Sequence, residues 1–132
     1  NEKIADALVL LLLGVTAAES FANGHASFRI LYGDNSRPLF GPGIAITFFS
    51  WLGLWVGGWF LCTWAIYAVA ARKISGWYLT LISGLISLLA ASATHYVRHT
   101  TNDYLYNALM GAGLVFFALF PYFKKHLWNK MS

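Results

Sequence analysis

Long apolar runs are the feature that most constrains what this chain can fold into. Four of them can be read, over residues 4–21, 44–71, 77–97 and 104–123. Each is close to or above the roughly 20 apolar residues that an α-helix needs to cross a bilayer. Charged residues make up only 11% of the chain, against about a quarter in soluble domains. We therefore expect a multi-pass, all-α integral membrane protein, with residues 1–132 forming a single domain built as a four-helix bundle.

The connections between the runs predict how the helices follow one another. Residues 33–43, rich in glycine and proline, mark a loop, and the other two connections are only a few residues long. Short connections make consecutive helices antiparallel neighbours. The basic residues are Lys3, Arg72, Lys73, Lys124, Lys125 and Lys130 on the side of the chain ends, and Arg29, Arg37 and Arg98 on the other side. The positive-inside rule then predicts both termini on the cytoplasmic side, and the loop and the turn at residues 94–103 on the periplasmic or extracellular side.

The net charge of +4 is placed at the ends of the predicted helices. Binding to nucleic acid would need basic residues clustered with aromatic residues outside the membrane. The C-terminal segment has only His126 and Trp128 beside its three lysines. We expect this tail to anchor the chain at the inner interface, in contact with lipid, and we expect no nucleic-acid partner.

Small and polar residues recur at steps of three or four along three of the helices. They are Thr16, Glu19, Ser20, Asn23 and Ser27 on the first, Thr80, Ser83, Ser87, Ala91, Thr94 and Arg98 on the third, and Asn107, Gly111, Val115 and Ala118 on the fourth. This spacing places each set along one helical face. Since small side chains let backbones approach closely inside a membrane, the pattern predicts that these faces are the contacts between helices.

Three indoles step by four along the second helix, at Trp51, Trp55 and Trp59, opposite a Gly-x-x-x-Gly pair. The glycines allow close packing on one face, while the other face carries the large indole side chains. Such a row could stack on a flat apolar cofactor such as a quinone, with Tyr96 or Tyr104 as a proton donor. Ordinary packing against another helix, lipid or a neighbouring subunit is the alternative.

The densest cluster of ionisable side chains precedes the last helix. His95, His99 and Asp103 step by four, and the spacing of the two histidines would present both imidazoles on one helical face. With Asp103 or Glu19 as the carboxylate, they form a candidate ligand set for a divalent metal ion. A haem fits less well, because it would need axial histidines from two helices. The alternative is a polar cap at the water boundary, in which Arg98 pairs with the acids and the histidines make hydrogen bonds.

Depth along the helices places separate polar groups at one level. Glu19 lies roughly 22 Å up the first helix and His95 roughly 27 Å up the third, at 1.5 Å per residue. Ser50 and Asn107 stand near the starts of the second and fourth helices, on that same side. These positions, with Asn23, predict a polar layer in the outer half of the membrane. An acid as deep as Glu19 needs a partner or a proton there.

A short stretch resembles a known family. Arg98-His99, followed by Asp103-Tyr104 ahead of the final helix, is similar to the Arg-His and Asp-Tyr elements of the membrane anchors of succinate dehydrogenase. That resemblance would imply a haem- or quinone-bearing anchor subunit. The position of the family's haem-ligating histidine holds Ser92, and its earlier Ser-x-x-His-Arg element is missing. The resemblance therefore assigns neither a haem nor a family to the chain.

Little of the chain lies outside the predicted spans, which leaves little room for independent catalysis. The sequence has no nucleotide-binding loop, nucleophile elbow or paired-cysteine motif. We predict a small subunit or accessory partner of a larger membrane complex, of a redox or energy-transducing kind, in contact with other membrane subunits. Two alternatives remain open. One is an oxidoreductase or electron-transfer component with its own metal or quinone site, and the other is a small oligomeric proton-coupled transporter built on Glu19 and His95.

Overall fold

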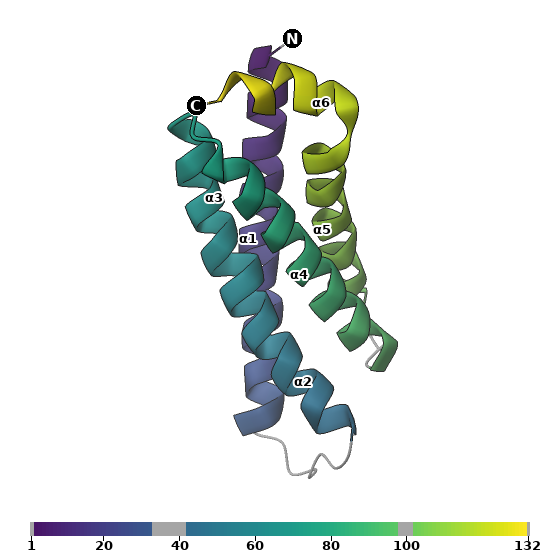
Figure 1. Cartoon of the computed structure of the whole chain (residues 1–132). Helices are drawn as coiled ribbons and strands as arrows, with labels where there is room; N and C mark the ends of the chain where they lie inside the picture. The colour runs from purple at the N-terminus through teal and green to yellow at the C-terminus, as the bar shows by residue number, and fades with distance from the viewer. Residues whose placement is uncertain (1, 33–41, 98–101, 132) are drawn as a thin grey trace.

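The computed structural model describes residues 2–32, 42–97 and 102–131, and over these the chain is helical with short turns. The helices are α1 (Glu2–Tyr32), α2 (Pro42–Leu52), the π-helix η1 (Gly53–Phe60), α3 (Leu61–Ala70), α4 (Ser75–Val97), α5 (Asp103–Leu119), α6 (Pro121–His126) and the 3-10 helix η2 (Trp128–Lys130). The segments α2, η1 and α3 follow one another without a break. They lie beside α1 and α4, α5 packs against the same two helices, and both chain ends are at the same end of the molecule (Figure 1). The all-α prediction is confirmed.

Within the described part of the chain, three helical stretches are long and apolar enough to cross a membrane: Lys3–Arg29, Ala45–Ala70 and Ser75–Val97. The bent pair of α5 and α6 makes a fourth if it is counted as one span. The first predicted span ends near residue 21, and the helix α1 continues beyond that point to Tyr32. Of the polar residues that interrupt the apolar run there, Asn23 and Ser27 are buried, whereas His25 and Arg29 are exposed.

The last predicted helix, residues 104–123, is broken near its end. The structure ends α5 at Leu119, and the axis turns by 59° before the next helix. Phe120 is extended, at φ −68° and ψ 129°. A residue before proline is pushed out of the helical region by the proline ring, so Pro121 fixes where α5 stops. Proline therefore does more here than remove one backbone donor.

Two indoles complete the hydrogen bonding of this broken helix end. In an unbroken helix the Ala118 carbonyl would accept from the backbone amide of Tyr122, whereas the Phe117 carbonyl would meet Pro121, which has no N–H to donate. Trp128 donates from Nε1 to the Phe117 oxygen at 2.8 Å, and Trp77 donates to the Ala118 oxygen at 2.7 Å. Buried carbonyls without donors are costly in an apolar medium. The two tryptophans thus stabilise the bend.

The predicted helix contacts are confirmed by burial. The buried members of the three stripes are Thr16, Ser20, Asn23, Ser27, Thr80, Ser83, Ser87, Ala91, Thr94, Asn107, Gly111 and Ala118. Glu19 and Val115 are partly buried, and Arg98 lies outside the described residues. Where α4 meets α5, a Cβ built on Gly111 would lie 2.8 Å from the Gly84 carbonyl oxygen. The backbones of α4 and α5 therefore touch, as small residues allow.

Large apolar side chains lie on the outer surface, while several polar side chains are inside. Leu11, Leu89 and Leu109 are 57–65% exposed, whereas Ser27, Ser83 and Thr94 are fully buried. A protein in water would not present so many large apolar side chains around its whole circumference. This distribution suits a lipid environment.

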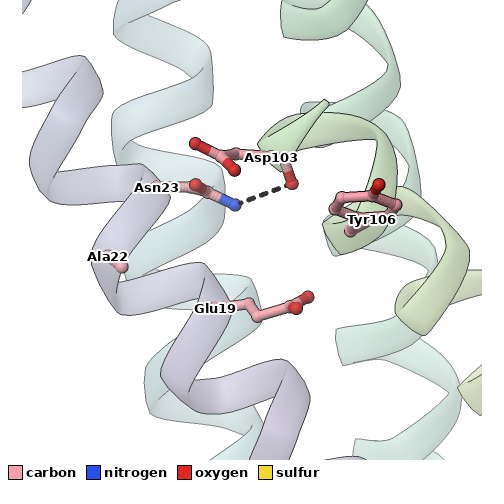
Figure 2. A pocket seen from close by; sticks show the side chains of 5 residues that line it. All are labelled: Glu19, Ala22, Asn23, Asp103 and Tyr106. Carbon is pink, nitrogen blue, oxygen red and sulfur yellow. Dashed lines mark hydrogen bonds between the residues drawn. The ribbon is translucent and has the colours of Figure 1, made fainter. Parts of the chain in front are cut away.

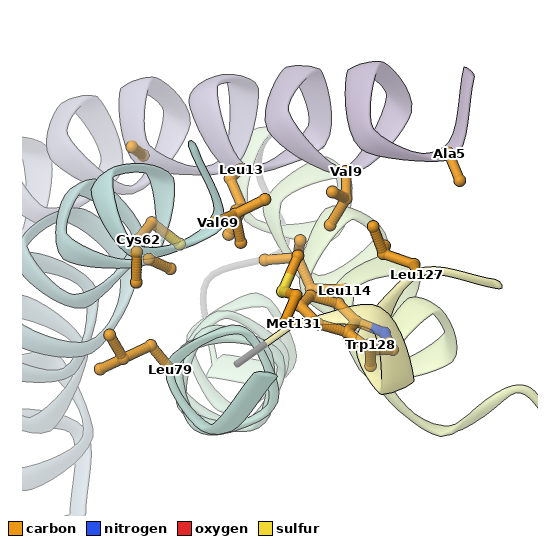
Figure 3. Close-up of a cluster of buried hydrophobic side chains, with 13 residues drawn as sticks. Ala5, Val9, Leu13, Cys62, Val69, Leu79, Leu114, Leu127, Trp128 and Met131 are labelled. Carbon is orange, nitrogen blue, oxygen red and sulfur yellow. The ribbon is translucent and has the colours of Figure 1, made fainter. Parts of the chain in front are cut away.

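At the end of the molecule that carries both termini, an apolar cluster closes the structure. Figure 3 shows Val9 and Leu13 of α1 facing Leu114, Leu127 and Trp128. All five are at most 1% exposed. The C-terminal segment, expected to lie as an anchor at the interface, therefore places its apolar residues in the core of the protein, while its lysines stay exposed.

Candidate functional site

Buried polar side chains from three helices form a hydrogen-bonded network at the opposite end. Ser27 of α1 lies 3.1 Å from the Ser50 hydroxyl of α2 and 3.1 Å from the Tyr104 hydroxyl of α5. The Tyr104 hydroxyl also donates to the backbone oxygen of Asn23 at 3.5 Å. One α1 serine thus joins the two helices that flank it.

Two asparagines continue the network along the contact between α1 and α5. Asn23 donates from Nδ2 to Asn107 Oδ1 at 2.9 Å and to the backbone oxygen of Asp103 at 3.3 Å. Asn107 donates in turn to the Ser20 hydroxyl at 3.2 Å. Three residues of the predicted polar layer, Asn23, Ser50 and Asn107, thus belong to one network, while its position in the outer half of a membrane stays a prediction. Its members are uncharged and bonded to one another, which suits a role in joining helices.

A cavity of about 260 Å³ opens beside this network, between α1 and α5. It is lined by Glu19, Ala22, Asn23, Asp103 and Tyr106. Figure 2 shows the Glu19 side chain reaching from α1 toward α5, on the same side as Asp103 and Tyr106. Ala22, Asp103 and Tyr106 are exposed, so the cavity is open to the surface.

The charged groups known to line this cavity are both carboxylates. Glu19 and Asp103 both line it, and among the described residues the five that line it include no basic one. The Glu19 Oε2 atom is buried and has no hydrogen-bond partner among the described residues. Because an isolated carboxylate is costly away from water, this group calls for a proton or for a cationic partner.

The predicted metal ligands are only partly brought together. The structure places Glu19 and Asp103 at one cavity, which His95 does not line. His95 belongs to α4 and Asp103 begins α5, in agreement with the predicted spans 77–97 and 104–123. His99 lies outside the described residues, and among the described ones no three His, Cys, Asp or Glu side chains are placed to hold a metal ion. The complete ligand set therefore stays a prediction.

The indole row packs on α1. Phe21 stacks on Trp55 with ring centroids 5.8 Å apart and contacts Trp59 edge-on at 5.0 Å, while Phe28 lies 5.2 Å from Trp51. Trp55 also donates from Nε1 to the Phe21 carbonyl at 3.2 Å. These contacts favour helix packing over a stacked cofactor.

The glycines on the opposite side of this helix pack on α4. A Cβ on Gly53 would lie 3.0 Å from the Ala90 side chain, and one on Gly57 would collide with Ile86. The helix is wound as a π-helix here, with the Leu61 amide donating to the Val56 carbonyl. The two predicted faces, one bulky and one small, therefore contact different neighbours.

The two tyrosines proposed as proton donors have different surroundings. Tyr104 is 6% exposed and belongs to the buried network, whereas Tyr96 is 85% exposed near the end of α4. Tyr106, which lines the acidic cavity, was not among the predicted site residues. Its position three residues after Asp103, on the same face of α5, is the signal that could have found it.

Comparisons with protein-family models, curated proteins and solved structures give no match. The short resemblance to the succinate dehydrogenase anchors therefore gains no support along the rest of the chain. Its Arg98-His99 element lies outside the described residues, and Tyr104 of its Asp-Tyr element is a buried member of the network. The function must be argued from the geometry.

Proposed function

We propose that this chain crosses a membrane four times, as a four-helix bundle with antiparallel neighbours and both termini on the inner side. The apolar lengths of the helices, the large apolar side chains on the surface and the common position of the two chain ends support this (Figure 1). The basic residues near the chain ends agree with that orientation. The polar network would then lie toward the outer side.

We further propose that the protein is a small subunit of a larger membrane complex. The observation that carries this proposal is Glu19, a partly buried acid within a membrane-crossing length of α1. One of its oxygens has no hydrogen-bond partner among the described residues, and Asp103 lines the same open cavity. Ionisable groups at such depth pair with opposite charges or mark functional sites.

The partner that fits the cavity best is a lysine or arginine side chain from a neighbouring transmembrane subunit. Two carboxylates accept hydrogen bonds from an ammonium or guanidinium group without the larger ligand set that a metal ion needs. The Tyr106 hydroxyl and the Asn23 side chain add polar groups to the same wall. A cation inserted from the side would fill the cavity and give Glu19 its partner.

The test combines purification with cross-linking. A tagged chain is purified from its own membrane in mild detergent, as wild type, Glu19→Gln and Asp6→Asn. Asp6 pairs with Arg72 near the chain ends and so is a matched acid outside the cavity. Losing one member of a buried charge pair costs about 2–5 kcal/mol, so Glu19→Gln should weaken retention of the partner by at least about tenfold. Asp6→Asn should retain it.

Cross-linking then identifies what occupies the cavity. Ala22→Cys places a thiol in the exposed lining, while the natural Cys62 is buried. The proposal expects a cross-link to a transmembrane segment that carries a lysine or arginine. A lone, monodisperse and active protein would contradict the subunit role. If that lone protein carried a proton flux lost in Glu19→Gln, the transporter alternative would replace it.

A further inference from the structure

A second cavity, of about 300 Å³, lies at the end of the molecule that carries the termini. It is lined by Ile74, Trp77, Tyr78, Lys124, Trp128 and Asn129. These residues come from the start of α4 and from the C-terminal segment that folds over the helix ends. The cavity therefore exists only because Pro121 turns the chain back across the bundle.

The walls of this cavity are held in place by the broken end of α5. The indole nitrogens of Trp77 and Trp128 donate to carbonyls of that helix, at 2.7 and 2.8 Å. The Lys124 ammonium group lies 5.2 Å from the centre of the Trp77 ring. The polar groups that the lining can offer a ligand are therefore the Lys124 ammonium, the Asn129 amide and the Tyr78 hydroxyl, over an aromatic floor.

The charge around the cavity favours an anion. The basic residues on the side of the chain ends are Lys3, Arg72, Lys73, Lys124, Lys125 and Lys130. Asp6, an acid near the same end, is paired with Arg72. Lysine, asparagine and tyrosine side chains supply donors for phosphate oxygens, and lysine adds the opposite charge.

An exposed apolar stripe leads away from the cavity along α4. It consists of Ile74, Tyr78, Ile82, Leu85 and Leu89, each at least 40% exposed and spaced by three or four residues. Residues at this spacing share one helical face. A ligand with an anionic head and a long apolar tail would match both the cavity and the stripe.

We propose that this cavity binds the phosphate-bearing head group of an anionic phospholipid, with an acyl chain lying along the α4 stripe. The inference requires that the chain lies in a membrane, but it does not require a partner subunit or the acidic cavity. Its outcome is therefore separable from that of the proposed subunit role. Basic pockets on the inner side of membrane proteins bind anionic head groups in this way.

The test measures lipid retention by native mass spectrometry of the purified protein. The probes are phosphatidylglycerol and phosphatidylcholine, added at equal concentration to wild type, Lys124→Gln and Lys125→Gln. Lys125 is the matched control, because it is exposed on the same short helix and does not line the cavity. One lysine near an anionic lipid surface is worth about 1 kcal/mol, so Lys124→Gln should weaken phosphatidylglycerol binding by about fivefold. Lys125→Gln should change it by much less.

Three outcomes would overturn the proposal. Equal retention of the two lipids would show that the head-group charge is not recognised. Equal loss in the two lysine variants would show diffuse surface attraction instead of a site. Displacement of phosphatidylglycerol by inorganic phosphate at the same concentration would show that the cavity binds the free anion and that the α4 stripe contributes nothing. Lys124→Arg should retain the lipid, and tryptophan fluorescence checks that each variant is folded.

Discussion

The hydrogen bond between Asn23 and Asn107 allows a direct energetic test of the buried network. Asn23 donates both to Asn107, at 2.9 Å, and to the backbone of Asp103, at 3.3 Å. Asn107 donates onward to Ser20. Replacing either asparagine with alanine therefore removes two hydrogen bonds, one of which belongs to both residues.

The expected magnitudes follow from that count. Hydrogen bonds between membrane helices contribute about 0.6 kcal/mol on average and about 1.7 kcal/mol at most. Each single variant, Asn23→Ala or Asn107→Ala, should lose about 1–3 kcal/mol of unfolding free energy. In the double variant the shared bond is lost once, so the total should fall short of the sum by about 0.6–1.7 kcal/mol.

The assay is equilibrium unfolding in mixed micelles at rising dodecyl sulfate, followed by the fluorescence of the six tryptophans. Thr63 is exposed and donates to a carbonyl of its own helix, so Thr63→Ala with Asn23→Ala forms a control pair that should be additive. The reasoning is refuted if Asn23 and Asn107 are as additive as the control pair. Large single effects without coupling would mean that the two amides act through separate contacts.

Three substitutions test the packing with the same titration. Gly111→Ala should lower the unfolding free energy by about 1–3 kcal/mol, because its Cβ would meet the Gly84 carbonyl oxygen, which cannot move without the helix. Gly14→Ala meets nothing within 4 Å, and it should be neutral or stabilising by up to about 1 kcal/mol; equal losses in the two variants would rule out the close α4–α5 contact. Trp128→Phe removes the donor to the Phe117 carbonyl and should cost about 1–3 kcal/mol, whereas unchanged stability would show that the broken helix end does not depend on the indole.

The hydrophobic pattern predicts the helices better than their ends. Apolar length alone indicates where a helix can cross a membrane, and it indicated residues 4–21 for the first. The helix continues to Tyr32 because Asn23 and Ser27 turn their polar groups toward other helices, where hydrogen bonds satisfy them. A hydropathy scale scores each residue by itself, so it does not include hydrogen bonds to partners that are distant in the sequence. The spacing of three or four residues predicted this part of the helix better, because it placed Asn23 and Ser27 on one face that packs against other helices.

The ionisable cluster falls between two helices, as the predicted spans 77–97 and 104–123 imply, and there regular spacing does not by itself show a shared face. His95 and Asp103 are separated by two steps of four, but α4 ends at Val97 and a new helix begins at Asp103. The residue types at the break also indicate a new helix. Asn102 and Asp103 favour the start of a helix, and an acid in the first turn interacts favourably with the helix dipole. Periodicity is evidence for a shared face only where nothing between the residues ends the helix.

Asn23 links the two parts of the candidate site. It donates into the buried network and also lines the acidic cavity. The network fixes the contact between α1 and α5 through uncharged groups that bond to one another, so its polarity is accounted for within the chain. Glu19, one turn before Asn23 on the same helix, has an oxygen without such a bond among the described residues. The hydrogen bonds that hold α1 against α5 therefore also hold Glu19 and Asp103 at one opening. Because the network's polar groups bond to one another and the Glu19 oxygen does not, we expect a molecule from outside the chain to bind at the cavity and not at the network.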